Sequence, residues 1–336
     1  MALRIGIATI IGGTMVLASG VMAARPDWRW PAFPAGVTAP ALPQGSSMSA
    51  ARVALGRRLF YDRALSHDNS MACADCHSQA RGFTDGQPTH VGATGEMGVR
   101  NVPGLTNVAW RGGLTWTDAG LTTLEAQAMV PMTGRKPVEM GMAGDDAQLA
   151  RRLDADPCYR RMFARAFPGA KGDMGYAGVT AALGAFQRTM ISFGSPYDRG
   201  ALSPLARKGA AQFAAAGCAA CHQGPDFTDG QVHYVGTAAP GEPDGSLYGG
   251  KPPPPGFEPP PERFRTPTLR NVAVTGPWLH DGRSGSIDQA IRRHAAAQLA
   301  GVEMPALLAF LDSLTDREFL ERKALGPPPA ACPVAL

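Results

Sequence analysis

The chain begins with an apolar stretch that carries no charge. Arg4 is followed by an uncharged run over residues 5–24, with its most apolar part at 5–17 and small residues near its end. A positive charge, a short apolar core and small residues at a cleavage point are typical of a secretory signal peptide. The alternative is an uncleaved membrane anchor, because the run approaches the length that spans a bilayer. We expect residues 1–24 to be a signal peptide.

Two later segments show the pattern of a helix start. Thr123 and Ser286 are each followed by an apolar residue and then by an acidic residue. A hydroxyl cap with an acid in the first turn is typical of a helix N-terminus, so we predict that a helix begins at each position. Residues 240–261, with four consecutive prolines at 252–255, predict a loop.

Composition and charge narrow the function classes. The chain has 336 residues, of which 44% are hydrophobic and 18% charged, so it can form a core and is not a disordered polymer. Its length suggests two domains of roughly 150 residues each. The net charge is only +4 and the basic residues are scattered, so we expect no nucleic-acid partner.

The six cysteines are too few for a disulfide scaffold, but four of them stand in a repeated motif. Cys-x-x-Cys-His occurs twice, as Cys73, Cys76 and His77 and as Cys218, Cys221 and His222. In a c-type haem the two thiols form thioethers with the vinyl groups, and the adjacent imidazole binds the iron. A zinc knuckle needs its cysteine pairs closer together, and a redox dithiol needs no following histidine. We therefore predict two covalent c-type haems with the motif histidines as iron ligands.

Two cysteines, Cys158 and Cys332, are left over. They can form a disulfide in an oxidising compartment. Sequence alone does not give the distance between them, so the pairing stays open.

The residues around the two motifs repeat. Phe-Thr-Asp-Gly follows each motif, at 83–86 and 227–230, and segments 103–109 and 267–273 share the pattern Pro-x-Leu-x-Asn-Val-Ala. We therefore predict a mainly α-helical fold with two cytochrome c-like haem domains from an internal duplication, with long loops. The predicted bounds are 45–195 for the N-terminal domain, 196–322 for the C-terminal domain and 323–336 for a Pro-rich tail.

Aligning the two halves shows a difference between them. When Thr123 is placed opposite Ser286, Pro131 falls opposite His294. Proline offers no side-chain ligand for iron, whereas histidine is a common nitrogen ligand. If this helical segment passes over each haem, we predict a first haem with one open face that can bind a small molecule such as peroxide, and a second, six-coordinate haem held by His222 and His294. The alternative is that His294 lies on the surface beside the two arginines that precede it.

Two polar side chains near Pro131 are candidates to line the open face. Gln127 can hold peroxide or water through its amide, and Glu139 can take a proton from peroxide and return it to the departing oxygen. The residues alone favour Glu139 as an ordinary exposed acid. The tryptophans nearest the motifs are Trp110, Trp116 and Trp278. Tryptophan can relay an electron between haems, although it is more often a core residue.

A larger set of segments matches a known family. These segments are 55–62, 100–101, 124–128, 137–140, 267–271 and 276–282. Together they resemble the bacterial di-haem cytochrome c peroxidase and MauG family over about residues 55–320. Segments 114–116 and 313–320 are most similar to the MbnH branch, the di-haem enzymes encoded with methanobactin genes. The resemblance implies a di-haem peroxidase-type oxidoreductase.

The resemblance also implies roles for individual residues. Glu139 and Gln127 match the distal acid and amide at the peroxide-binding haem, and Pro131 matches the proline over that iron in MauG. Trp116 matches the tryptophan between the haems, with a spacing that differs by one residue. The positions that match the surroundings of a calcium ion between the domains are Asn101, Thr275 and Pro277. Oxygen ligands of this kind suit calcium.

The ligand position of the second haem departs from the family pattern. His294 stands where the peroxidases have Met and MauG has Tyr. Met favours ferrous iron and a high potential, whereas an imidazole donates more strongly to oxidised iron, which makes storage of an oxidising equivalent easier. In the first half, no histidine has the spacing of the peroxidases' displaceable distal ligand. His90 is close to that position in the sequence but does not coincide with it. If His90 does not bind, the first haem is open without prior reduction.

These observations predict a MauG- or MbnH-like periplasmic enzyme. Hydrogen peroxide reacts at the first haem, the two oxidising equivalents spread over both haems as a high-valent state, and a partner protein loses electrons from a side chain, with tryptophan expected. The MbnH resemblance implies a small copper-associated partner whose tryptophan becomes kynurenine. The alternatives are a cytochrome c peroxidase that takes electrons from a small cytochrome, and a di-haem electron carrier with two six-coordinate irons.

Overall fold

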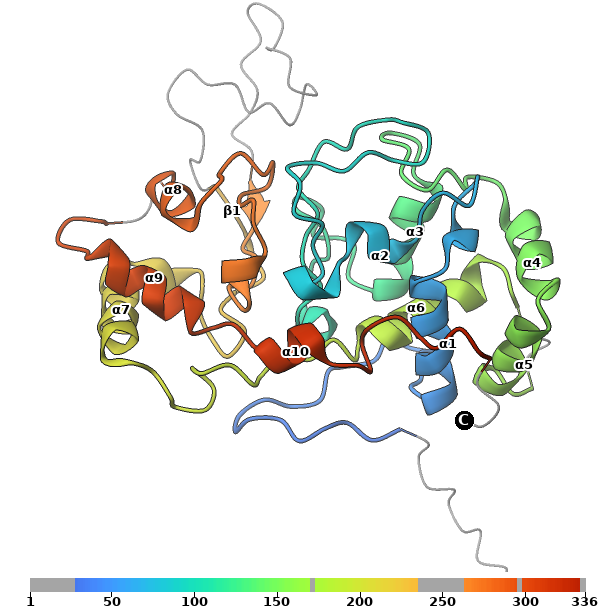
Figure 1. Ribbon diagram of the computed structural model, residues 1–336, viewed down its shortest axis with the longest axis horizontal. Helices are drawn as coiled ribbons and strands as arrows, with labels where there is room; N and C mark the ends of the chain where they lie inside the picture. Colours follow the sequence, from blue (N-terminus) through green and yellow to red (C-terminus); the bar gives the residue numbers. More distant parts are fainter. Residues whose placement is uncertain (1–27, 170–172, 235–262, 295–297, 333–336) are drawn as a thin grey trace, which may run out of the picture.

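The computed structural model describes residues 28–169, 173–234, 263–294 and 298–332 (Figure 1). The predicted signal peptide at 1–24 and the predicted loop at 240–261 lie outside these residues. In the part of the chain that is described, no helix is long and apolar enough to cross a membrane.

The fold is mainly α-helical, as predicted. The α-helices are α1 (Ala50–Phe60), α2 (Cys73–Cys76), α3 (Leu124–Thr133), α4 (Asp146–Asp154), α5 (Pro157–Ala166), α6 (Tyr176–Gln187), α7 (Pro204–Ala215), α8 (Ile287–Arg292), α9 (Met304–Asp312) and α10 (Arg317–Glu321). Short 3-10 helices are η1 (Arg63–Leu65), η2 (Gln79–Arg81), η3 (Val108–Trp110), η4 (Cys218–Ala220) and η5 (Val272–Val274). Two short antiparallel strands, β1 (Val232–His233) and β2 (Phe264–Arg265), pair in the second half.

Both predicted helix starts are confirmed. The Thr123 hydroxyl caps α3 by accepting a hydrogen bond from the Ala126 amide at 3.2 Å. The Ser286 hydroxyl caps α8 in the same way, accepting from the Gln289 amide at 3.2 Å. Each cap satisfies one of the amides that a helix N-terminus leaves without a partner.

The two halves are built around the same close helix contact. In the first half α1 packs on α6 at Gly56, where an added Cβ would lie 1.9 Å from the Ala182 carbonyl oxygen. In the second half α7 packs on α9 at Gly209, where a Cβ would lie 1.9 Å from the Ala306 carbonyl oxygen. Only glycine allows the two backbones to approach this closely.

A pair of asparagines repeats in the same way. Asn107 and Asn271 both have a positive φ, of 52° and 61°, and precede η3 and η5. The Asn107 side-chain oxygen accepts from the Ser192 amide at 2.7 Å, and that of Asn271 accepts from the Asp316 amide at 2.8 Å. These equivalent contacts agree with the predicted duplication.

The end of the chain returns to the first half. Figure 1 shows α10 and the segment after it crossing from the second half over α1 towards α5. Phe319 of α10 packs against Phe83 with ring centroids 5.7 Å apart, although α10 lies within the predicted second domain by sequence. The guanidinium of Arg57 on α1 donates to the Gly326 carbonyl at 2.7 Å. The predicted domain bounds remain predictions, but the Pro-rich tail is attached to the first half.

The disulfide that the sequence leaves open is present between Cys158 and Cys332. It joins α5 to the tail across a sequence separation of 174 residues.

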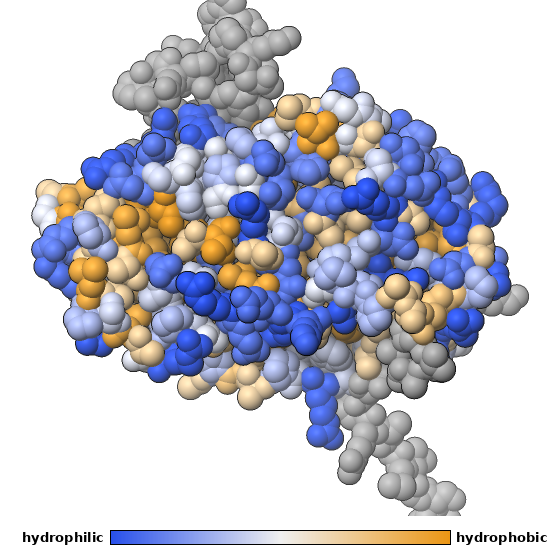
Figure 2. Space-filling view, viewed as in Figure 1, coloured by the Kyte–Doolittle hydropathy of each residue, from blue (hydrophilic) through white to orange (hydrophobic). Residues whose placement is uncertain are grey.

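Figure 2 shows that, on the face seen in Figure 1, hydrophobic residues are more visible over the half with α7 and α9 than over the half with α4 and α5.

Removing this disulfide should destabilise the protein. We expect Cys332→Ser to lower the free energy of unfolding by about 2–4 kcal/mol, because the bridge restricts a long loop of the unfolded chain. Denaturant titration in an oxidising buffer measures the change. The double variant, which also carries Cys158→Ser, should lose little further free energy of unfolding, since both changes remove the same bridge. An unfolding curve of Cys332→Ser that overlays that of the wild type would contradict the expectation.

Candidate haem sites and family

The first Cys-x-x-Cys-His motif places a neutral imidazole with one nitrogen free. Cys73 and Cys76 lie on α2, and His77 follows directly, with its amide donating to the Cys73 carbonyl at 2.9 Å. Its ring Nδ1 lies 2.7 Å from the Phe83 carbonyl oxygen, which can only accept, so Nδ1 carries the proton. Burial lowers the pKa of His77. The unprotonated Nε2 is therefore left to bind iron.

The second motif repeats this geometry. The His222 amide donates to the Cys218 carbonyl at 2.9 Å, and its Nδ1 donates to the Phe227 carbonyl at 3.1 Å. Burial lowers the pKa of His222 to about 4, so the ring is neutral at ordinary pH. Phe83 and Phe227, which supply the two accepting carbonyls, both have a positive φ, of 65° and 51°. Each half thus presents two thiols that can attach a haem and one oriented imidazole that can bind its iron. These are the protein groups that hold a c-type haem.

A cavity of about 450 Å³ lies beside the second motif. Its lining includes the motif residues Cys218, Cys221 and His222, together with His294. The His294 Nδ1 lies 2.7 Å from the Ala290 carbonyl oxygen, so this ring also keeps its Nε2 free. Apolar residues complete the walls, among them Phe213, Val272, Ile291, Leu307 and Leu311. Thiols, two imidazoles and apolar walls are surroundings that would hold a covalent haem; the role of His294 as its second ligand remains a prediction.

In the first half, α3 carries the residues predicted for the open face. Gln127 and Pro131 lie on this helix and are half-buried. Arg188, the residue that follows α6, fixes α3 by donating to both carboxylate oxygens of Glu125, at 2.7 and 2.9 Å. The Pro131 carbonyl accepts from the Met140 amide at 2.9 Å. This bond places Glu139, the residue before Met140, close to the end of α3 that carries Pro131.

The surroundings of Glu139 differ from those of an ordinary exposed acid. Its side chain is half-buried rather than exposed, and burial raises its pKa, while the charge of His90 acts in the opposite direction. A raised pKa keeps a carboxyl closer to the range in which it can both take and give a proton. The catalytic role of Glu139 remains a prediction.

A hairpin over residues 90–98 holds the backbone at Glu139, and sequence reasoning missed it. The Ala93 amide donates to the Glu139 carbonyl at 2.7 Å, and the Glu96 carboxylate accepts from the Val138 amide at 2.9 Å. At Gly92 an added Cβ would lie 2.0 Å from the Val138 carbonyl oxygen. Two glycines, Gly92 and Gly95, bound the turn and were the available signal.

Gly92→Ala tests this hairpin contact. The new methyl group must displace the 138–139 backbone, so we expect the reaction with peroxide to slow by about 10–100-fold, since small misplacements of a catalytic group have effects of this size. Stopped-flow absorbance gives the rate, and the haem content should be unchanged. Gly112→Ala is the matched control, because no atom lies within 4 Å of its Cβ position. Equal rates for the two variants would show that the hairpin does not position Glu139.

Asp–His pairs next to both motifs were also missed. His90 Nδ1 lies 3.0 Å from an Asp85 carboxylate oxygen, and His233 Nε2 lies 2.7 Å from one of Asp229. Asp85 and Asp229 belong to the repeated Phe-Thr-Asp-Gly segment, which was the available signal. Cys221, a predicted haem-attachment residue, lies close to the second pair. We therefore treat that group as part of the haem site.

The region between the halves contains the remaining predicted residues. The indole of Trp116 donates to the Asn101 carbonyl at 2.7 Å. Both residues line the cavity of the second motif, as do Thr275 and Pro277. The Asn101 side-chain amide donates to the Gln87 carbonyl at 2.8 Å, which leaves its side-chain oxygen as a possible ligand. The structure thus brings the three predicted calcium positions and Trp116 together.

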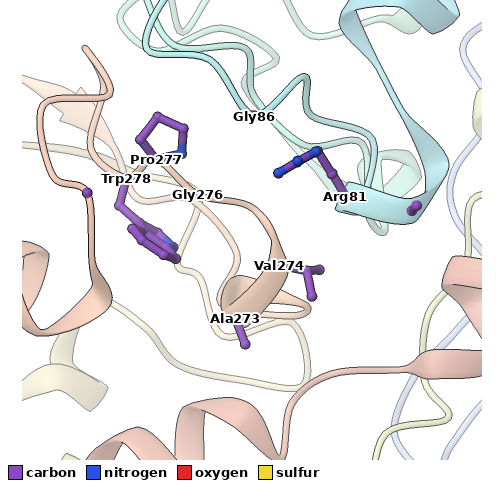
Figure 3. Close-up of a pocket in the computed structure, with 9 residues that line it drawn as sticks. Arg81, Gly86, Ala273, Val274, Gly276, Pro277 and Trp278 are labelled. Carbon is purple, nitrogen blue, oxygen red and sulfur yellow. The ribbon is translucent and has the colours of Figure 1, made fainter.

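A second, open pocket separates the two halves. It measures about 650 Å³ and is lined from both sides. Figure 3 shows Arg81 of the first half extending into it, opposite Gly276, Pro277 and Trp278 of the second half. The pocket places a positive charge close to one of the three predicted calcium positions.

Comparison with known proteins identifies the family. A family model described as di-haem cytochrome c peroxidase matches residues 50–203. The methylamine utilization protein MauG of Methylorubrum extorquens is 38% identical over 256 residues, which are 74% of this chain and 70% of that protein. The chain belongs to the di-haem cytochrome c peroxidase and MauG family. Family membership implies two haems, in agreement with the two motif sites.

Further relatives come from both branches of the family. A cytochrome c peroxidase of Escherichia coli is 31% identical over 300 residues, 81% of this chain and 60% of that protein. A solved structure of a MauG-like protein associated with microbial copper homeostasis is 31% identical and has a TM-score of 0.78. The match covers 90% of this chain and 99% of that protein. The protein is therefore a di-haem peroxidase-type oxidoreductase with peroxide as its implied substrate.

Proposed function

We propose that this protein uses hydrogen peroxide to oxidise a side chain, with tryptophan expected, of a partner protein. The observation that carries the proposal is the inequality of the two halves. His294 shares a cavity with His222 in the second half, whereas Pro131 takes the aligned position at the end of α3 in the first. With the haems bound, His222 and His294 would both hold the iron of the second haem, and the lack of a donor atom at Pro131 would leave the first iron accessible to peroxide.

The haems, when bound, supply the redox chemistry, namely the reduction of peroxide and the retention of its oxidising equivalents over both centres. The protein's own residues bind and orient the peroxide. Glu139 takes the proton from one peroxide oxygen and delivers it to the other, which departs as water. Gln127 holds the peroxide by a hydrogen bond from its amide. Pro131 keeps the site free of a protein ligand.

Three further observations support a proposal for the partner and the compartment. The MauG-like relative of known structure is associated with copper homeostasis, which supports a copper-associated partner. That this partner is small and that its tryptophan becomes kynurenine is what the resemblance to the MbnH branch implies. The disulfide between Cys158 and Cys332 and the apolar sequence at 1–24 support export to the periplasm.

We also propose a calcium ion at the position between the halves. The Asn101 side-chain oxygen and the backbone oxygens of Thr275 and Pro277 are hard ligands of the kind that calcium prefers. Removing calcium with a chelator should alter the environment of Trp116, because its indole hydrogen bond goes to Asn101. Tryptophan fluorescence before and after chelation measures this. Identical spectra in the wild type, together with no calcium by elemental analysis, would contradict the proposal.

The second candidate function is peroxide removal with electrons from a small cytochrome, favoured by the 31% identity to the cytochrome c peroxidase of Escherichia coli. A turnover experiment separates the two candidates. Peroxide is added to the ferric protein with reduced small cytochrome c, with and without prior reduction of the enzyme. We expect peroxide consumption to need no prior reduction and cytochrome oxidation to be slow. Rapid cytochrome oxidation that begins only after prior reduction would favour the peroxidase.

A further inference from the structure

A row of aromatic side chains near residue 28 is not used by the haem chemistry described above. The Trp28 and Trp30 rings lie 5.7 Å apart between centroids, Trp30 lies 6.3 Å from Phe33, and Phe33 lies 5.4 Å from Trp110. The indole of Trp110 donates to the Thr38 carbonyl at 2.9 Å, which fixes this segment against the first half. The row therefore runs from a segment at the surface to a residue of η3.

The row continues from Trp110 towards the second haem site. The Trp110 ring lies 5.7 Å from that of Phe193. The guanidinium of Arg270 lies over Phe193 at 4.5 Å and over Phe227 at 5.8 Å. Arg270 lines the cavity of the second motif, and the Phe227 carbonyl accepts the His222 hydrogen bond. One ring and one guanidinium thus separate Trp110 from the cavity.

The charge of Arg270 does not oppose oxidation of the neighbouring rings. Asp198 accepts two hydrogen bonds from the guanidinium, both at 2.9 Å, so the cation is neutralised in place. Trp110 itself keeps its indole proton on the Thr38 carbonyl. An electron can therefore leave and return to Trp110 without a proton having to move.

We propose that Trp110, Trp30 and Trp28 form an electron relay between the di-haem site and the surface, and this inference rests on the proposed function. The site oxidised by peroxide takes one electron from Trp110. Trp110 is restored by Trp30, Trp30 by Trp28, and Trp28 by the donor side chain of the partner. Two passages per peroxide reduce it to two waters with two protons from solvent, while the donor loses two electrons. Phe33 and Phe193 are not oxidised and serve as packed contacts between the steps.

The sequence and burial support this role for the segment. Three of the five tryptophans of the chain lie in the row, and tryptophan is among the most easily oxidised side chains. Trp28 and Trp30 are half-buried, so their rings pack within the row while part of each remains accessible. The Tyr197 ring lies 5.1 Å from that of Phe227 and the residue is 39% exposed, so Tyr197 is the surface residue against which the relay is tested.

The test uses the full di-haem protein and peroxide without a partner. In the wild type we expect a tryptophan radical by EPR and oxidised Trp28 or Trp30 by peptide mass spectrometry. In Trp110→Phe, which keeps an aromatic ring, oxidation of Trp28 and Trp30 should fall and the oxidised form should persist at least about tenfold longer. Tyr197→Phe is the matched control and should behave as the wild type.

The outcomes separate the relay from the function on which it rests. If Trp110→Phe reacts with peroxide at the wild-type rate but oxidises Trp28 and Trp30 as before, the relay is wrong and the proposed function stands. If Tyr197→Phe, and not Trp110→Phe, lengthens the lifetime, Tyr197 is the exit and the relay is again wrong. If the ferric wild type does not react with peroxide at all, both proposals fail.

Discussion

Glu139→Gln is expected to slow the reaction with peroxide by about 10²–10⁴-fold, the usual contribution of a general acid–base group, while both haems remain attached. The amide has nearly the same shape, but it cannot take a proton from one peroxide oxygen and give it to the other. Stopped-flow absorbance of the ferric protein measures the rate. Glu318→Gln serves as the control. It removes an exposed acid on α10 that accepts a hydrogen bond from Arg322.

The pH dependence gives a second readout of the same group. Glu139 must be ionised to accept the first proton, so the wild-type rate should fall as the pH drops through its pKa. Because burial raises this pKa, the fall should begin at a higher pH than for an ordinary glutamate, whose pKa is about 4.3. Glu139→Gln should lose this dependence. A variant that keeps the wild-type rate above this pKa, or the wild-type pH dependence, would reject the acid–base role.

His294→Ala is expected to change the spectrum of one haem only. The structure gives His294 a free Nε2 in the same cavity as His222, so removal of the imidazole should abolish one low-spin EPR signal completely and replace it with a high-spin signal. Added imidazole should restore the low-spin signal. His67→Ala, in the first half, is the control and should leave both haems unchanged. If neither haem responds to His294→Ala, the ligand assignment is wrong.

His294→Met tests what the imidazole does for function. A thioether ligand favours ferrous iron and raises the potential of the haem. We therefore expect this variant still to react with peroxide in the ferric state, because the first haem is unchanged, but to lose most of the lifetime of its peroxide-oxidised form. A lifetime equal to that of the wild type would show that the second ligand does not control storage of the oxidising equivalents.

The features that sequence could predict are those encoded locally. The Cys-x-x-Cys-His motifs place all three haem-binding groups within a single turn of chain, and the caps at Thr123 and Ser286 act within three residues. The repeated sequence segments predict that the two halves are alike. In the structure, the helix contacts at Gly56 and Gly209 are likewise equivalent.

The features that sequence could not predict depend on contacts between distant residues. Nothing near Phe319 indicates that α10 returns to the first half and meets Phe83. The contact of Gly92 with the backbone at Val138, and that of Phe33 with Trp110, likewise arise only when separate segments fold together. The distance that decides the Cys158–Cys332 disulfide has the same origin.

The central claim is that the ferric protein reacts with peroxide directly and stores both oxidising equivalents. One equivalent of peroxide is added to the fully ferric protein, and near-infrared absorbance and Mössbauer spectra are recorded over time. We predict a long-lived form in which both haems have changed and which returns to the ferric state on addition of two electrons. A protein that shows no change at either haem until one of them has been reduced would contradict the account.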